Sequence, residues 1–271
     1  MMNLDMASMA LIAANVIISL QGFKNRAFLD KWTFEVGKIL GGKEYYRMIS
    51  SGFVHVDGNH LLFNMLSLFF FAGNIERSLG IEGLLAVYFG SLLAGSLFSL
   101  VVHRNSPGYR AVGASGAVSG VVFAAIALFP GMKLGLLFLP IFFPAWVFGL
   151  GFVAYSIYGI RSQRDNVGHE AHLGGAIVGL LIALLFDPQA FFNNTFTILL
   201  IFIPTAIFMI IAWQKPQWLF KRQVQPQTMD DSYNERQAQL KAELNRILEK
   251  VNTHGADSLT HQEREFLNHF R

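Results

Sequence analysis

Residues 111–129 read AVGASGAVSGVVFAAIALF, an apolar run without a charged residue. A helix needs about 20 apolar residues to cross the hydrocarbon core of a bilayer. Backbone N–H and C=O groups inside that core must be hydrogen-bonded within their own element, which favours a helix. The run therefore predicts a transmembrane helix with Ser115 near its start.

Similar apolar blocks lie on both sides of this run, at 6–22, 60–79, 81–103, 134–158, 170–187 and 195–213. Hydrophobic residues make up 53% of the chain and charged residues 14%, whereas a typical soluble domain is about 25% charged. This composition excludes a disordered chain and argues against a water-soluble enzyme. We predict an all-α membrane protein, a polytopic helical bundle.

Charged residues are concentrated after the last apolar block, in 215–271. Apolar residues recur there at helical spacing, at Leu240, Leu244, Ile247, Leu248 and Val251. His254-Gly255 indicates a helix stop, and Thr260 with Glu263 fits a capping box that begins a second short helix. We expect a small soluble helical tail, which either binds a partner or is only solvated.

Composition also limits the cofactors and partners. The absence of cysteine excludes disulfides, zinc–thiolate sites and iron–sulfur clusters. His169 and His172 are three positions apart rather than the four of the zinc-protease motif, and no P-loop is present. The net charge is +3, but the basic residues are scattered between apolar blocks. A lipid bilayer is therefore a better partner than nucleic acid.

Two polar residues inside predicted spans have the chemistry of a nucleophile and a base. Ionisable groups in a span are costly and usually functional, and His172 is such a group. Small residues at four-residue spacing, which let helix backbones touch, follow both residues: Gly116 and Gly120 after Ser115, and Gly175 and Gly179 after His172. Close packing of these spans would bring Ser115 beside His172, as nucleophilic catalysis requires. For Ser115 alone, a structural small residue at a helix contact is the alternative.

His60 and Asn64 are four residues apart and so project from one face of the second span. Both side chains can donate hydrogen bonds, and with the backbone N–H of Ser115 they could bind a developing oxyanion. The alternative is a polar contact that holds two spans together. His55 either orders the loop above His60 or has no role.

Four stretches, in this order, resemble motifs of the rhomboid intramembrane serine proteases: 46–55, 60–65 followed by Glu76, 113–116, and 171–179. The resemblance covers about residues 6–187 and implies a six-span protease core (1–190), with an additional transmembrane helix (191–214) before the charged tail (215–271). It implies a Ser–His dyad without an acidic third member, with Ser115 as nucleophile and His172 as base, and it implies no metal or cofactor. His60 and Asn64 match the oxyanion positions.

The resemblance also implies supporting roles. Arg47 matches a structural arginine of the first loop, and Glu76 a structural acid at the end of the second span. The remaining glycines of the motifs are Gly113 and Gly116, and Gly175 and Gly179. One departure concerns Ser119, because many members carry at this position an aromatic residue that would stack on the base. Here the orientation of His172 needs another explanation.

The expected function is therefore cleavage of transmembrane protein substrates by an intramembrane serine endopeptidase, in a multi-pass protein of the bacterial inner membrane. The alternative is a non-catalytic relative that binds transmembrane clients. A small-solute transporter would show inverted repeats, which are not evident. The basic loops predict that the first loop is cytoplasmic, whereas the resemblance implies that this loop and the Ser115 end face outward; we follow the resemblance.

Overall fold

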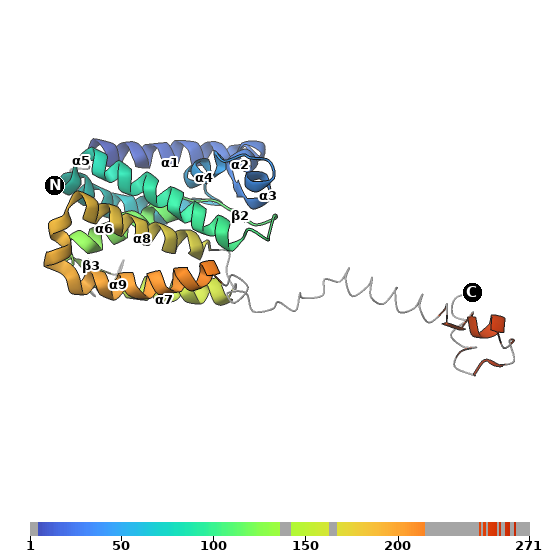
Figure 1. The fold of residues 1–271 in the computed structure, drawn as a ribbon. Coiled ribbons are helices and arrows are strands. Elements are labelled where there is room, and N and C mark those ends of the chain that lie inside the picture. Colours follow the sequence, from blue (N-terminus) through green and yellow to red (C-terminus); the bar gives the residue numbers. More distant parts are fainter. Residues whose placement is uncertain are drawn as a thin grey trace. The chain divides into compact units, whose positions relative to one another are not determined.

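The computed structural model describes residues 5–135, 142–162 and 167–214, together with short pieces between 244 and 263. The chain divides into two compact units, Met1–Lys221 and Arg222–Arg271, which are described separately. The first unit is mostly helical (Figure 1), which confirms the predicted helical class.

The helices and strands of the first unit come from all parts of its sequence. The helices are α1 (Met6–Lys24), α2 (Arg26–Trp32), α3 (Val36–Leu40), α4 (Arg47–Ser50), α5 (Gly58–Val102), α6 (Ser115–Leu128), α7 (Ala145–Ser162), α8 (His169–Phe186) and α9 (Pro188–Gln214), with one 3-10 turn, η1 (Ser51–Phe53). Strands β1 (Phe34–Glu35) and β2 (Arg110–Ala111) form one antiparallel pair, and β3 (Lys133–Gly135) and β4 (Phe142–Pro144) form another.

Four helices, α1, α5, α8 and α9, are long and apolar enough to cross a membrane, and α6 is a shorter apolar helix. The 45 residues of α5 include the predicted block 60–79 and the block 81–103 up to Val102. Gly80 separates the blocks with φ 74°, a left-handed conformation that glycine adopts without strain. The element labelled α5 is therefore two helices that meet at Gly80, one for each predicted block.

Two predictions need correction. The block 134–158 does not begin as a helix, because Lys133–Gly135 pairs with Phe142–Pro144 as a hairpin and α7 begins only at Ala145. Pro144 has no backbone N–H to donate, so the chain before α7 cannot continue that helix in regular form. The two short sheets are likewise outside the all-α class that we predicted.

Helices α6 and α8 occupy the middle of the unit, with α5 and α1 on one side and α7 and α9 on the other (Figure 1). The predicted contact through small residues is confirmed. A Cβ on Gly120 would lie 2.9 Å from the carbonyl oxygen of Gly175, and one on Gly179 would overlap the backbone of Gly120. The two backbones can touch only because these residues are glycines, whose side chain is a single hydrogen atom.

Helix α1 carries three buried polar residues on one face, Ser8, Asn15 and Ser19. Ser8 and Asn15 bond to residues of α5, whereas Ser19 bonds to the loop before that helix. The hydroxyl of Ser8 donates to the carboxylate of Glu76 at 2.6 Å, and the backbone N–H groups of Ala7 and Ser8 donate to the same carboxylate. Glu76 therefore supplies acceptors for the first turn of α1, whose N–H groups have no partner within the helix.

The second unit contains the predicted capping box. The backbone N–H of Thr260 donates to the Glu263 carboxylate at 2.8 Å, and the N–H of Glu263 donates to the Thr260 hydroxyl at 3.3 Å, which confirms this prediction. Gly255 has φ 78°, and its N–H donates to the carbonyl of Val251, as at a helix end. Leu240, Leu248 and His254 lie outside the described residues.

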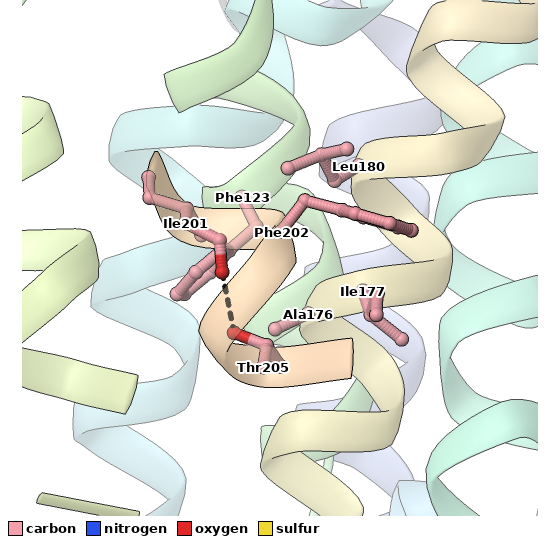
Figure 2. Close-up of a pocket in the computed structure, with 7 residues that line it drawn as sticks. All are labelled: Phe123, Ala176, Ile177, Leu180, Ile201, Phe202 and Thr205. Atoms are coloured by element: carbon pink, nitrogen blue, oxygen red, sulfur yellow. Dashed lines mark hydrogen bonds between the residues drawn. The ribbon is translucent and has the colours of Figure 1, made fainter. Parts of the chain in front are cut away.

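A small apolar pocket lies among α6, α8 and α9 (Figure 2). Its lining residues are Phe123, Ala176, Ile177, Leu180, Ile201, Phe202 and Thr205. The hydroxyl of Thr205 donates to the carbonyl of Ile201 at 2.7 Å, so this group is already paired within its own helix. The pocket is therefore lined by apolar groups, and the polar residues that could take part in a reaction lie elsewhere in the unit.

Candidate active site

Ser115 is the first residue of α6, and a glycine turn leads into it. Gly113 has φ 123°, and a Cβ there would lie 2.7 Å from Nε2 of His60. The N–H of Gly113 donates to the carbonyl of Ser51 at 2.9 Å, which ties the turn to the first loop. Both the backbone conformation and the close imidazole ring therefore require glycine.

His55 holds the backbone of this turn through an ordered set of hydrogen bonds. Ser19 Oγ donates to the carbonyl of Phe53 at 3.0 Å, so it accepts from Nδ1 of His55 at 2.8 Å. With its proton on Nδ1, the ring accepts the N–H of Ala114 at Nε2, at 3.3 Å. Burial, with a smaller contribution from repulsion by His60, lowers the pKa of His55 to about 3. The ring is neutral at physiological pH.

This arrangement predicts a pH dependence of folding stability. Because the pKa of His55 falls from 6.5 to about 3 on folding, the neutral ring contributes its full stability above pH 6.5. That contribution decreases as the pH falls towards 3, since the unfolded chain then binds the proton more tightly. We expect His55→Gln to lower the unfolding temperature at neutral pH and to weaken its dependence on pH, measured in detergent micelles at neutral pH and at about pH 5. An equally steep pH dependence in the variant would contradict this assignment.

His60 and Asn64 lie on the first two turns of α5, beside the turn before Ser115. Asp57 caps the helix by accepting the N–H of His60 at 2.8 Å. The His60 ring packs edge-on against His55, with ring centroids 4.9 Å apart. Asn64 is buried, and its amide donates to the carbonyl of His60 at 2.9 Å. Since a carboxamide carries two N–H groups, this bond leaves one that it does not use.

His172 lies on the first turn of α8, at the level of the Ser115 end of α6. Gly116, which follows Ser115, packs against Ala171, which precedes His172: a Cβ on Gly116 would lie 3.2 Å from the Ala171 carbonyl oxygen. Ser115 and His172 are both half-buried. The ring of His172 is flanked by Phe152 of α7 and by His169, with centroids 5.6 and 5.8 Å away.

A buried hydrogen-bonded pair, His103 and Glu170, anchors the start of α8. Nε2 of His103, the residue that ends α5, lies 3.1 Å from the Glu170 carboxylate, and both side chains are less than a tenth exposed. The ring of Tyr109 stacks on His103, with centroids 3.5 Å apart and planes 8° apart. This cluster connects the loop after α5 to the residue two positions before His172.

The first loop is held by Arg47, which is buried although it is charged. Its guanidinium donates to the carbonyls of Asp30 and Thr33, at 2.8 and 2.7 Å, and to the Glu44 carboxylate at 2.6 Å. These bonds compensate the loss of hydration of the buried guanidinium, at the end of the loop that leads to His55.

Sequence reasoning missed several of these residues. Ser8, Asn15 and Ser19 carried a detectable signal, since polar residues at helical spacing in an apolar span need partners. The pairing of His103 with Glu170 and the contact between Phe152 and His172 carried none. Their members are far apart in the chain and come together only through packing.

Comparison with known proteins identifies the family. A family model described as "Rhomboid domain" matches residues 42–189, more than half of the chain. The chain belongs to the rhomboid family. A rhomboid domain with these long apolar helices is a multi-pass integral membrane protein. The matched range includes all the motif residues from Arg47 to Gly179.

Rhomboid relatives are found in mitochondria and bacteria. The chain is 34% identical over 179 residues to "Rhomboid protein 1, mitochondrial" of Saccharomyces cerevisiae, covering 62% of this chain and 52% of that protein. It is 29% identical over 184 residues to "RHOMBOID-like protein 12, mitochondrial" of Arabidopsis thaliana, covering 62% and 54%. It is 32% identical over 144 residues to "Putative rhomboid protease YdcA" of Bacillus subtilis, covering 52% and 67%.

The chain thus spans about half the length of the first two relatives. A second family model, described as a "Family of unknown function (DUF6576)", matches residues 227–270. This range lies wholly within the charged tail (215–271) and does not overlap the rhomboid domain.

Proposed function

We propose that this rhomboid is an intramembrane serine endopeptidase in which Ser115 is the nucleophile and His172 the general base. The observation that supports this most is the contact between Gly116 and Ala171, because these residues are the chain neighbours of Ser115 and His172. Both side chains are half-buried, so each remains accessible from outside the packed core.

The reaction follows from these positions. His172 removes the proton from Ser115 as its Oγ attacks the carbonyl carbon of the scissile peptide bond. The tetrahedral intermediate collapses when His172 gives that proton to the leaving amine, which leaves an acyl-enzyme. Water, activated by the same imidazole, then attacks the ester, releases the acid and restores Ser115.

The oxyanion requires donors in place before the reaction. The first N–H groups of a helix have no partner within it, and that of Ser115 is one of them. The positive end of the α6 dipole favours negative charge at the same point. We assign His60 and the unused amide N–H of Asn64 as side-chain donors, since His60 packs on Gly113, two residues before Ser115. Arg47, His55 and Glu76 support the loop and helix α1 that surround this site.

The substrates in this proposal are transmembrane segments of other membrane proteins, because the site opens within helices that cross the bilayer. The six-span core (1–190) performs the chemistry, the additional helix (191–214) packs beside α7 and α8, and the tail (215–271) forms a separate soluble part. We place the protein in a bacterial inner membrane.

Labelling with a fluorophosphonate probe tests this proposal, since only an activated serine reacts. We expect the purified full chain, reconstituted in liposomes, to be labelled and to cleave a fluorescent transmembrane reporter peptide. Ser115→Ala should abolish both signals. A folded wild-type protein that binds the reporter but is neither labelled nor active would instead be a non-catalytic client-binding member.

A further inference from the structure

We propose that Phe152 of α7 is a positioning residue that orients the imidazole of His172. This inference rests on the proposed dyad. The ring centroids of Phe152 and His172 are 5.6 Å apart and their planes differ by 33°, within the range of favourable offset ring contacts. Phe152 belongs to α7 and His172 to α8, so the contact fixes the imidazole ring from a neighbouring helix.

A dyad without a third member needs another way to orient its base. A histidine ring on a helix can rotate about two side-chain bonds, and only some orientations direct a nitrogen at the nucleophile. Ser119, one turn after Ser115, offers no ring, and its hydroxyl donates to the carbonyl of Ser115 at 2.7 Å. Two described rings lie beside His172. That of His169, on the same helix, meets it edge-on at 79°, whereas that of Phe152 is tilted by only 33° and presents its face, which restricts this rotation.

Phe152 can do this because its own ring is held in place. Phe123 of α6 is fully buried, and its ring lies 5.5 Å from that of Phe152, tilted by 58°. Phe148, one turn earlier on α7, packs at 5.9 Å. The rings form a continuous row from α6 through α7 to His172. The relative position of these helices therefore sets the orientation of the base.

The position of Phe152 has a kinetic consequence. Phe152 contacts the base rather than the nucleophile, so its loss should slow the chemical step and leave reporter binding nearly unchanged. Aromatic contacts of this kind stabilise one geometry only modestly, and misplacement of a catalytic group reduces the rate by up to about a hundredfold. We expect about a tenfold lower kcat for Phe152→Leu, with KM within about twofold of wild type.

The experiment compares Phe152→Leu with the ring-retaining Phe152→Tyr in the full chain in liposomes. Tyr158→Leu is the matched control, because Tyr158 is also an aromatic residue of α7 but is 58% exposed. The readouts are kcat and KM for the reporter peptide and the rate of fluorophosphonate labelling. The probe is small, so its rate reports activation of Ser115 independently of how a transmembrane substrate reaches the site.

We expect Phe152→Leu to slow labelling and kcat together by about tenfold, and Phe152→Tyr and Tyr158→Leu to remain close to wild type. Unchanged labelling in Phe152→Leu, or an equal loss in Phe152→Tyr, would overturn the proposal. If Phe152→Leu does not fold, as judged by thermal unfolding, Phe152→Met preserves the volume without a ring and is read in the same way. An inactive, unlabelled wild type would instead refute the dyad itself, and this proposal with it.

Discussion

Ser115→Ala is expected to abolish cleavage of the reporter peptide, and His172→Ala to reduce it by about 10³-fold or more, because removal of either member of a nucleophile–base pair removes most of the function of both. Without the hydroxyl no acyl-enzyme forms. Without the imidazole, the Ser115 proton has no positioned base to accept it.

Ser67→Ala is the matched control for this prediction. The hydroxyl of Ser67 donates to the carbonyl of Phe63 within α5, so its loss should leave cleavage unchanged. The measurements are initial rates of reporter cleavage for wild type and the three variants, each with a thermal unfolding curve. Cleavage by folded Ser115→Ala or His172→Ala at more than about a tenth of the wild-type rate would exclude the dyad mechanism.

Gly175→Ala is expected to destabilise the protein more than Gly151→Ala, a glycine substitution at an open position of α7. The added methyl group would overlap the carbonyl group of Gly116. Because this obstacle is backbone rather than a flexible side chain, α6 and α8 must separate to admit it. Overpacking of this kind costs about 1–3 kcal/mol in free energy of unfolding, and separation of the helices should also reduce cleavage.

Gly151→Ala is the control for this prediction, since no atom lies within 4 Å of a Cβ at that position on α7. The two variants differ only in what the methyl group meets. The measurement is the unfolding temperature in detergent micelles, with reporter cleavage assayed in parallel. Equal unfolding temperatures for Gly175→Ala and Gly151→Ala would show that the backbone contact between α6 and α8 can relax.

Much of the helical architecture could be predicted from the sequence, because a membrane span is a local property. Apolar blocks of sufficient length predicted α1, both helices of α5, and α8 to within a few residues, whereas α9 begins at Pro188, seven residues before the predicted block at 195–213. The block at 134–158 was wrong at its start, because hydropathy does not distinguish an apolar hairpin from an apolar helix. The proline at position 144 was the local sign of that difference.

The candidate site, too, was predictable from the sequence only in part. Glycines four residues apart predicted that α6 and α8 touch, and the close approach of Gly120 to Gly175 confirms it. Sequence spacing could not show that His55 binds the N–H of Ala114, 59 positions away. It suggested only that His55 orders the loop or has no role.

By itself, the sequence determined that the chain is a helical membrane protein, which residues are its candidate nucleophile and base, and where the tail has a capping box. These features depend on hydropathy, on glycine spacing and on hydrogen bonds between residues three or four apart. Only the tertiary structure decided that His103 pairs with Glu170 and that Phe152 lies against His172. Such contacts join residues on different helices, and their geometry is set by how the helices pack rather than by any local preference of the chain.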